Sequence, residues 1–348
     1  MDSVDDDTIF ISESIKTYTI NFLDQKNYIT QAINTLSEAG LINAENTTFE
    51  ANALEGKKQH FYTDILNTLH AKEYSEWILT LDDAAYHKIR LDHTQNSWSS
   101  AWLMNIPHNK HSIMDNDSFQ NALKLRLGIP FHNRPEKCIC KDKKLIDHHL
   151  THILSCMSCA RHNIENRHFE IQKDIHSLAI DGHIRTSSYG ISLDNGRRAD
   201  LEFHGEGKNG KNLMADITIV SSVCASYMEQ SFMNKNFVIE NAERLKMQKY
   251  SQACIEQNVD FLPLVFEMFG EPSNTTIKII QQFVKKASGV SKIPYHILMF
   301  YWKKRISTTL QKMNAAILSF GCNYIFNKQN NSEPINLYVE SRLHHKIQ

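Results

Sequence analysis

Four cysteines and three histidines gather in one short stretch near the middle of the chain. They are Cys138, Cys140, Cys156 and Cys159, interleaved with His148, His149 and His152. Zn²⁺ prefers four thiolate or imidazole ligands in a tetrahedron, and two close pairs of ligands let a short segment wrap the ion. Cys138-x-Cys140 and His152-x3-Cys156 supply two such pairs, so we expect them to bind zinc.

The surrounding segment, residues 131–160, is polar and poor in large apolar side chains, so metal binding would supply folding free energy that packing lacks. The set of ligands stays open, because Cys159 could replace Cys156 and either neighbouring histidine could replace His152. A redox pair at Cys156-x2-Cys159 is disfavoured, since no strand of the thioredoxin type precedes it. The alternative to a metal site is an ordinary loop with buried cysteines and surface histidines.

Three acidic residues form a second group suited to chemistry. Asp200 and Asp216 lie on the outward faces of two strands that alternating apolar residues predict over 199–203 and 213–220. Opposed residues on paired strands lie about 5 Å apart. Mg²⁺ is held by one or two carboxylates together with phosphate oxygens, and it can activate water against a phosphodiester. Glu202 shares this face as a further candidate ligand; the alternative is a solvated hairpin.

A long helical pattern at about 226–258 follows these strands. Lys246 and Lys249 project along the side that carries Ala242 and Ala253, where small residues allow a close approach to the sheet. A lysine at this contact could stabilise the charge on an attacked phosphate. The alternative interpretation is a solvated basic stripe.

The elements that must position these residues follow from the apolar spacing. Residues 1 to about 125 are predicted to be mostly helical, and 161–180 form another helix, whose apolar face includes His168 and so favours a core histidine. From 161 onward the order is helix, three strands, helix, strand, helix, helix. The predicted strands are 189–193, 199–203, 213–220 and 261–266. The fold class is therefore α/β, with a mixed sheet flanked by helices after a helical N-terminal region.

Changes in this pattern predict five parts of the chain. We expect a helical linker-like region at 1–130, the cysteine- and histidine-rich segment at 131–160, an α/β core at 161–270, C-terminal helices packed on that core at 271–325, and a loose tail at 326–348.

Composition limits the classes of function. The 348 residues are 41% hydrophobic, which excludes a fully disordered chain, and 38 basic residues nearly cancel 39 acidic ones. The net charge of -1 argues against a uniformly basic coat but permits a local basic groove. No apolar run approaches the roughly 18–20 residues of a membrane span, and the acidic N-terminus lacks the order of a signal peptide. We expect an intracellular protein without a membrane partner.

Taken in order, these motifs resemble the C-terminal region of non-LTR retrotransposon proteins. In that region a CCHC zinc knuckle precedes a restriction-like endonuclease of the PD-(D/E)XK superfamily. The resemblance covers about 100–320 and rests on the cysteine and histidine spacing, Arg161-His162-Asn163, Arg198-Ala199-Asp200, Asp216-Ile217-Thr218 and Lys246-x3-Tyr250.

The resemblance implies a role for each matching residue. It implies zinc ligands at Cys138, Cys140, His152 and Cys156, metal-binding carboxylates at Asp200 and Asp216, a catalytic lysine at Lys246 with Tyr250 beside it, and a supporting motif at Arg161, His162 and Asn163. Two positions depart from the family pattern. Ala199 replaces the usual proline, and Thr218 stands where the superfamily's lysine would be, so activity would depend on Lys246 or Lys249.

The function that the resemblance implies is a metal-dependent DNA endonuclease that nicks DNA with Mg²⁺ or Mn²⁺. It implies a nuclear location, DNA as partner, with RNA as a further ligand of the knuckle, and a reverse transcriptase encoded upstream; we expect no small-molecule substrate. The chain carries no Tyr/Phe-x-Asp-Asp polymerase signature. The alternatives are a catalytically inactive, retroelement-derived nucleic-acid-binding protein and a structural zinc protein that binds another protein.

Overall fold

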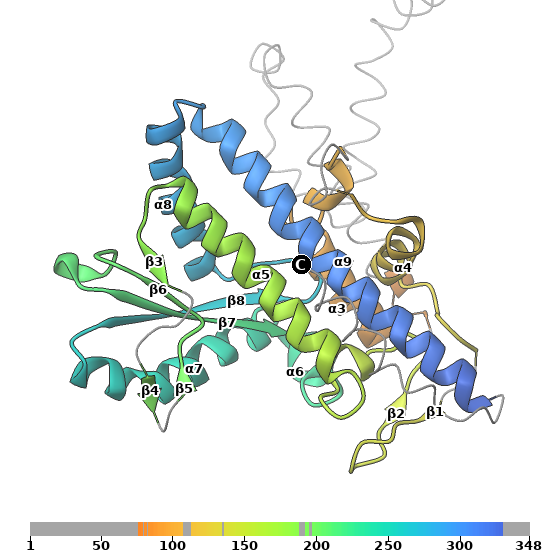
Figure 1. The fold of residues 1–348 in the computed structure, drawn as a ribbon. Helices are drawn as coiled ribbons and strands as arrows, with labels where there is room; N and C mark the ends of the chain where they lie inside the picture. The colour runs from red at the N-terminus through yellow and green to blue at the C-terminus, as the bar shows by residue number, and fades with distance from the viewer. Residues whose placement is uncertain are drawn as a thin grey trace, which may run out of the picture. The chain divides into compact units, whose positions relative to one another are not determined.

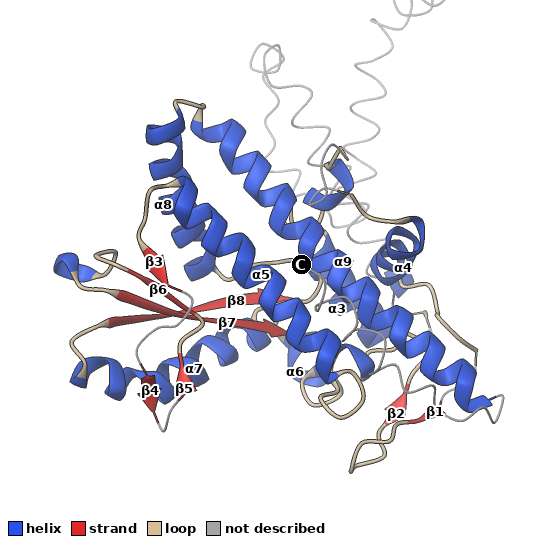
Figure 2. Cartoon of the chain, in the orientation of Figure 1, coloured by secondary structure: helices blue, strands red, loops and turns tan. Residues whose placement is uncertain are grey.

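The computed structural model describes residues 76–329, apart from 79, 82, 107–112, 134–135, 188–191 and 195–196. The chain divides into two compact units, Met1–Leu81 and Asp82–Gln348, and Figures 1 and 2 show the elements of the second. Most of the predicted N-terminal helices lie outside the described residues. Within the described part, no helix is long and apolar enough to cross a lipid bilayer.

A four-stranded mixed sheet forms the centre of the second unit. Its strands, in spatial order, are β3 (Thr186–Ser187), β6 (Leu201–Phe203), β7 (Leu213–Val220) and β8 (Asp260–Glu267). β3 pairs antiparallel with β6, β6 pairs antiparallel with β7, and β7 pairs parallel with β8. The predicted α/β class and mixed sheet are confirmed, and β7 has the predicted bounds.

The edge of this sheet differs from the prediction. The segment predicted as a strand at 189–193 contributes β4 (Ser192–Asp194), which pairs with β5 (Arg197–Arg198) in a separate two-stranded ribbon. The two segments are separated by a very short connection, so they pair with each other and leave the edge position to β3. The prediction that 189–193 joins the central sheet was therefore wrong.

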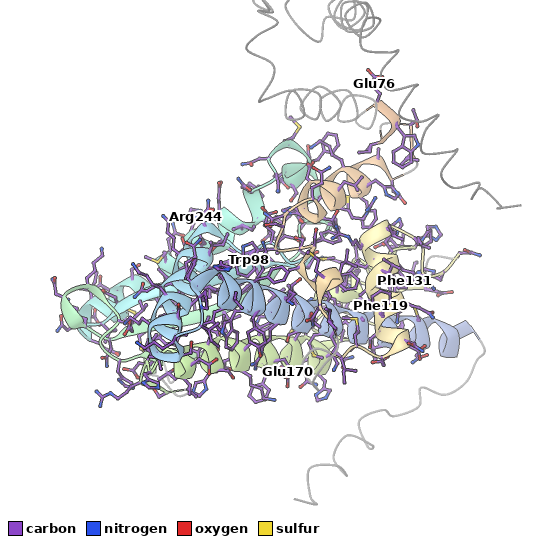
Figure 3. All side chains as sticks on the ribbon, turned by 90° about the horizontal axis from the view of Figure 1, so that it is seen from above. Glu76, Trp98, Phe119, Phe131, Glu170 and Arg244 are labelled. Atoms are coloured by element: carbon purple, nitrogen blue, oxygen red, sulfur yellow. The ribbon has the colours of Figure 1, made fainter. Side chains whose placement is uncertain are left out.

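Helices cover both faces of the sheet (Figure 1). One face packs against α5 (Arg161–Asp181), α8 (Asn274–Ser291) and α9 (Tyr295–Gln329), and the other against α7 (Phe237–Glu256), which follows the short α6 (Met228–Met233). Figure 3 shows Glu170 of α5 and Arg244 of α7 on opposite sides of the molecule. α9 continues past residue 326, into the segment expected as a loose tail.

Alternation along the strands decides which residues each helical layer receives. Leu201, Ala215 and Ile217 face the layer of α5, α8 and α9, where the fully buried Trp302 also lies. Met214 faces α7 and packs with Tyr250. Asp216 is two residues further along the same face of β7 as Met214, so the sheet directs its side chain toward α7.

A second core lies beside the sheet and includes the cysteine- and histidine-rich segment. Its elements are α3 (Ala84–Thr94), η2 (Ala101–Met104), α4 (Asn116–Leu127), β1 (Glu136–Lys137), β2 (Leu145–Ile146), η3 (Ile153–Ser155) and the C-terminal half of α9. Ile146, Leu150, Ile153 and Leu154 are fully buried there. The few large apolar side chains of 131–160 therefore pack against residues of α3 and α9.

Candidate functional site

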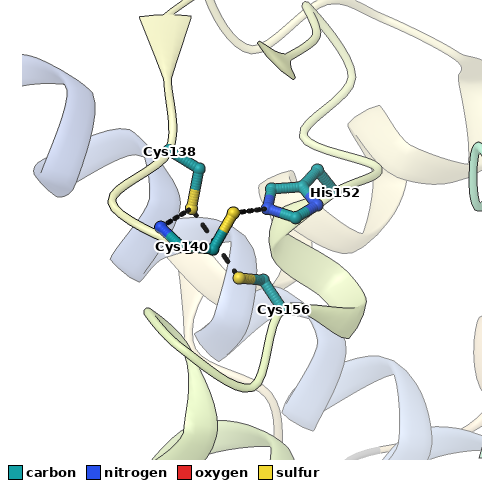
Figure 4. A group of neighbouring side chains, drawn as sticks. All are labelled: Cys138, Cys140, His152 and Cys156. Atoms are coloured by element: carbon teal, nitrogen blue, oxygen red, sulfur yellow. Dashed lines mark hydrogen bonds between the residues drawn. The ribbon is translucent and has the colours of Figure 1, made fainter. Parts of the chain in front are cut away.

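The cysteine and histidine cluster forms one compact set of donor atoms (Figure 4). The donor atoms of Cys138, Cys140, His152 and Cys156 all lie within 4.8 Å of one another. A tetrahedral zinc ion with bonds of about 2.3 Å to sulfur and about 2.05 Å to nitrogen separates two sulfurs by about 3.8 Å, and a sulfur from a nitrogen by about 3.6 Å. The Sγ atoms of Cys138 and Cys156 are 3.7 Å apart, and Sγ of Cys140 lies 3.5 Å from Nε2 of His152. The set fits zinc.

Local backbone bonds hold the four donors in place. The amide of Cys138 donates to Lys144 O, which closes the β1–β2 ribbon, and the amide of Cys140 donates to Sγ of Cys138. On the other side, the carboxylate of Asp147 accepts from His149 N, fixing the turn that leads to His152. Burial lowers the pKa of His152, which favours the neutral imidazole that a metal requires.

The ligands left open by the sequence are placed outside this set. Sγ of Cys159 lies 3.6 Å from Sγ of Cys138 but is not within reach of all four donors. His148 hydrogen-bonds through Nδ1 to His132 O at 2.9 Å, and His149 stacks on Tyr86 with ring centroids 3.9 Å apart. Both histidines are therefore engaged elsewhere.

The two aspartates meet at the end of the β6–β7 pairing. Leu201 pairs with Ala215, so continuing this antiparallel register by one residue sets Asp200 opposite Asp216. Oδ2 of Asp200 accepts the amide of Ile217 at 2.7 Å, which turns the carboxylate across onto β7. The two carboxylates therefore lie close together, just beyond the end of the β6–β7 ladder.

Lys246 completes the group from α7. Its Nζ lies 2.5 Å from Oδ2 of Asp216, and its side chain is 27% exposed. Burial and the charge of Asp216 raise the pKa of Tyr250, one turn further on. Thr218 Oγ1 donates to Oδ2 of Asp216 at 3.3 Å. Lys249 is exposed and lies over the Tyr250 ring, with Nζ 4.7 Å from the centroid.

The closeness of Asp200 and Asp216 affects the pKa of Asp200. Burial and, second, the negative charge of Asp216 raise the pKa of Asp200 to about 6, against the opposing effects of the Ile217 amide and Lys246. A cation placed between the two groups would stabilise their ionised, carboxylate forms. Asp200 and Asp216 could therefore hold a divalent metal ion, with the ammonium of Lys246 as the neighbouring positive charge.

Two residues of α5 join this site that the sequence did not indicate. His168 lies near enough to Lys246 and Asp216 for their charges to affect it, and burial is the main reason that its pKa falls to about 4. Gln172, one turn later, donates from Nε2 to the backbone oxygen of Asp200 at 2.5 Å. The position of His168 on an apolar helical face indicated only burial, which it has in part.

The other predicted site residues make their contacts with groups other than Asp200 and Asp216. Glu202 is buried and accepts from Asn212 Nδ2 at 2.7 Å and from Ser187 Oγ at 3.3 Å. The Arg161-His162-Asn163 motif occupies the first turn of α5, directly after the cysteine and histidine cluster. Arg161 is exposed and approaches Glu165, and His162 contacts Asn166. The motif therefore lies at the end of α5 nearest the cluster, about two turns before His168.

In comparisons with known proteins, no family model matches this sequence, and no curated protein matches it.

Proposed function

We propose that this chain is a metal-dependent DNA endonuclease that nicks its substrate, built on a restriction-like core of the PD-(D/E)XK type. The observation that carries the proposal is the convergence of Asp200, Asp216 and Lys246 from two strands and a helix. The order α5, β3, β6, β7, α7, β8, with one parallel pair after an antiparallel meander, is the arrangement expected of such a core.

The roles of the residues follow from their contacts. Asp200 and Asp216 would hold Mg²⁺ or Mn²⁺, which would supply Lewis-acid stabilisation of the phosphodiester and a more acidic water. Thr218 orients the Asp216 carboxylate through its hydroxyl group, and Tyr250 lies near the same carboxylate. Lys246 is the cation nearest to the carboxylates and would donate to a non-bridging phosphate oxygen, where negative charge increases during attack.

The cysteine and histidine set supports the second part of the proposal, a zinc knuckle that positions nucleic acid. The zinc ion would fix the loops around Cys140 and Cys156 against the start of α5. Arg161 and His162 then present donors from the first turn of that helix, where they would contact DNA, or RNA bound at the knuckle. From the resemblance to retrotransposon proteins, we propose that the chain acts in the nucleus and has a reverse transcriptase as its partner.

A second function rests on one departure from the superfamily. Thr218 occupies the position two residues after the second aspartate, where a lysine is expected, so the site has one cation fewer on β7. If Lys246 does not compensate, the chain would be a catalytically inactive nucleic-acid-binding protein that keeps the nuclease fold as a scaffold.

A plasmid-nicking assay tests the proposal. The full chain is incubated with supercoiled DNA in Mg²⁺ or Mn²⁺, and Asp216→Asn is compared with Glu170→Gln, an exposed carboxylate of α5 that pairs with Lys173. We expect metal-dependent nicking that Asp216→Asn abolishes and Glu170→Gln leaves unchanged. Retention of DNA without cleavage would support the inactive binding protein, and no binding at low salt would support a structural zinc protein.

A further inference from the structure

Charge is distributed unevenly along the chain, although the two signs nearly cancel overall. Residues 272–332 contain nine of the 38 basic residues and none of the 39 acidic residues. This stretch comprises α8 and α9. The C-terminal helical pair is therefore strongly positive, and the rest of the chain is negative by nearly the same amount.

Three lysines of this stretch form a row along α8 and its C-cap. Lys278, Lys285 and Lys292 are seven residues apart, which is nearly two helical turns, so they lie along one side of the helix at intervals of about 10 Å. All three are exposed. Among the described residues, no ion pair involves any of them.

The surroundings of the row are polar. The large apolar side chains of α8, including Ile280 and Phe283, are buried against the sheet. One carboxylate lies nearby, that of Glu206, but Lys286 pairs with it at 2.5 Å and Gln282 donates to it at 3.1 Å. The charges of the three row lysines therefore remain uncompensated. The exposed apolar side chains beside them, Val290 and Ile293, lie only at the C-terminal end of the row.

We propose that the row of Lys278, Lys285 and Lys292 binds the phosphate backbone of duplex DNA. Evenly spaced cations on a straight, polar helical face complement a regular line of phosphates, and they carry no means of reading bases. A membrane-binding helix would instead expose apolar side chains beside its lysines. The choice of DNA rests on the proposed function, but the binding does not require cleavage.

The place of the row distinguishes it from the candidate catalytic site. α8 packs on the face of the sheet opposite α7, which carries Lys246. The row would therefore bind a part of the DNA other than the phosphodiester held between Asp216 and Lys246. Losing the row should raise the KM for cleavage and leave kcat unchanged.

The test measures the binding of a fluorescent DNA duplex of about 30 base pairs to the full chain carrying Asp216→Asn, which prevents cleavage. Lys278→Gln/Lys285→Gln is the test variant; Lys292 is left intact because it is the C-cap residue, beyond the last residue of α8. Lys88→Gln/Lys173→Gln is the matched control, since these lysines carry the same total charge but pair with Asp92 and Glu170. Lys278→Arg/Lys285→Arg retains the charge.

We expect the test variant to lose roughly ten- to a hundredfold in affinity near 0.1 M salt and to lower the slope of log Kd against log salt by about two. The control and the arginine variant should keep the original slope. An unchanged slope in the test variant, or equal losses in test and control, would overturn the inference. So would row-dependent binding to vesicles of anionic lipid in place of DNA.

The two proposals fail in different ways. If the parent chain does not nick DNA but its binding depends on Lys278 and Lys285, the nuclease proposal fails and the row stands. If the chain nicks DNA and the row variant binds and cleaves with unchanged affinity and KM, the nuclease stands and the row is overturned.

Discussion

Nζ of Lys246 lies 2.5 Å from Oδ2 of Asp216, and this ion pair joins the helix α7 to the central strand β7. The carboxylate that the lysine contacts is also the one that a catalytic cation would need. The ammonium group and a divalent metal ion therefore repel each other at this position. Metal binding and the position of Lys246 must be linked.

We expect Lys246→Met to bind Mn²⁺ several-fold more tightly than the parent chain and yet to nick DNA at least about a hundredfold more slowly. Removing the ammonium group relieves its repulsion of the metal, while the charge near the phosphate is lost. Calorimetric titration with Mn²⁺ and the plasmid assay measure the two effects. Lys249→Met, at the exposed neighbour, should change both by less. Weaker metal binding in Lys246→Met would contradict this reading of the ion pair.

Zinc content tests the ligand set at the cluster. Cys156→Ala and His152→Ala should reduce bound zinc from about one ion per chain to a small fraction, and lower the free energy of unfolding, because the second core packs around these loops. Cys159→Ala should retain the ion, since Cys159 lies outside the set. Cys224→Ala, in a residue far from the cluster in sequence, is the control. Metal analysis of the purified variants gives the answer; loss of zinc in Cys159→Ala alone would reassign the fourth ligand.

His93 predicts a pH dependence of stability. Burial lowers its pKa, but the nearby carboxylates of Glu267 and Glu271 outweigh burial, so the pKa of His93 is raised above its ordinary 6.5. Nδ1 of His93 lies 2.9 Å from Oε2 of Glu271. Since folding favours the protonated form, this stabilisation is fully present below pH 6.5 and is lost as pH rises through the raised pKa.

In urea unfolding at a series of pH values, His93→Gln should therefore be less stable than the parent chain at pH 6. The difference in free energy of unfolding should shrink toward pH 9. His176→Gln, in α5, serves as a histidine control, and its stability difference from the parent should not change with pH in the same way. A difference for His93→Gln that grows with pH would show that the histidine is neutral in the folded protein.

Arg167 predicts a large loss of stability. It is buried in the middle of α5 and donates from Nη1 to Asn314 Oδ1 at 2.8 Å and from Nη2 to Leu154 O at 3.2 Å. Arg167→Met would leave these acceptors and the charge of Glu267 without a buried cation, which should cost about 3–5 kcal/mol. Arg161→Met, at an exposed position of the same helix, should change the free energy of unfolding by less than about 0.5 kcal/mol. Equal small effects in both variants would argue against a structural role for Arg167.

The sequence predicted the parts of the fold that local patterns encode. Alternation over 213–220 predicts a strand because every second side chain is buried, and β7 has those bounds. The same alternation placed Asp200 and Asp216 on one face, and helical spacing placed Lys246 toward the sheet. These three residues were predictable because each depends on the period of its own element and on one hairpin register.

The remainder depended on contacts between distant segments. His168 reaches the neighbourhood of Asp216 through the way α5 crosses the sheet, which no local pattern specifies. Leu150 and Ile153 have irregular spacing, and their partners on α9 lie more than 160 residues away in the sequence. The choice of β3 as the sheet edge was likewise made by tertiary pairing rather than by strand propensity.

The packing of α9 predicts the effect of truncating the chain within this helix. The helix has 35 residues and is about 50 Å long. Its Trp302 and Leu310 pack in the core between the sheet and the helices, and its Ile317 and Leu318 pack in the second core with the cysteine-rich segment. A premature stop codon shortly before residue 300 would remove the side chains that α9 contributes to both cores. A truncation at that position would therefore destabilise both cores together, whereas one between Leu310 and Ile317 would remove only the side chains that pack in the second core.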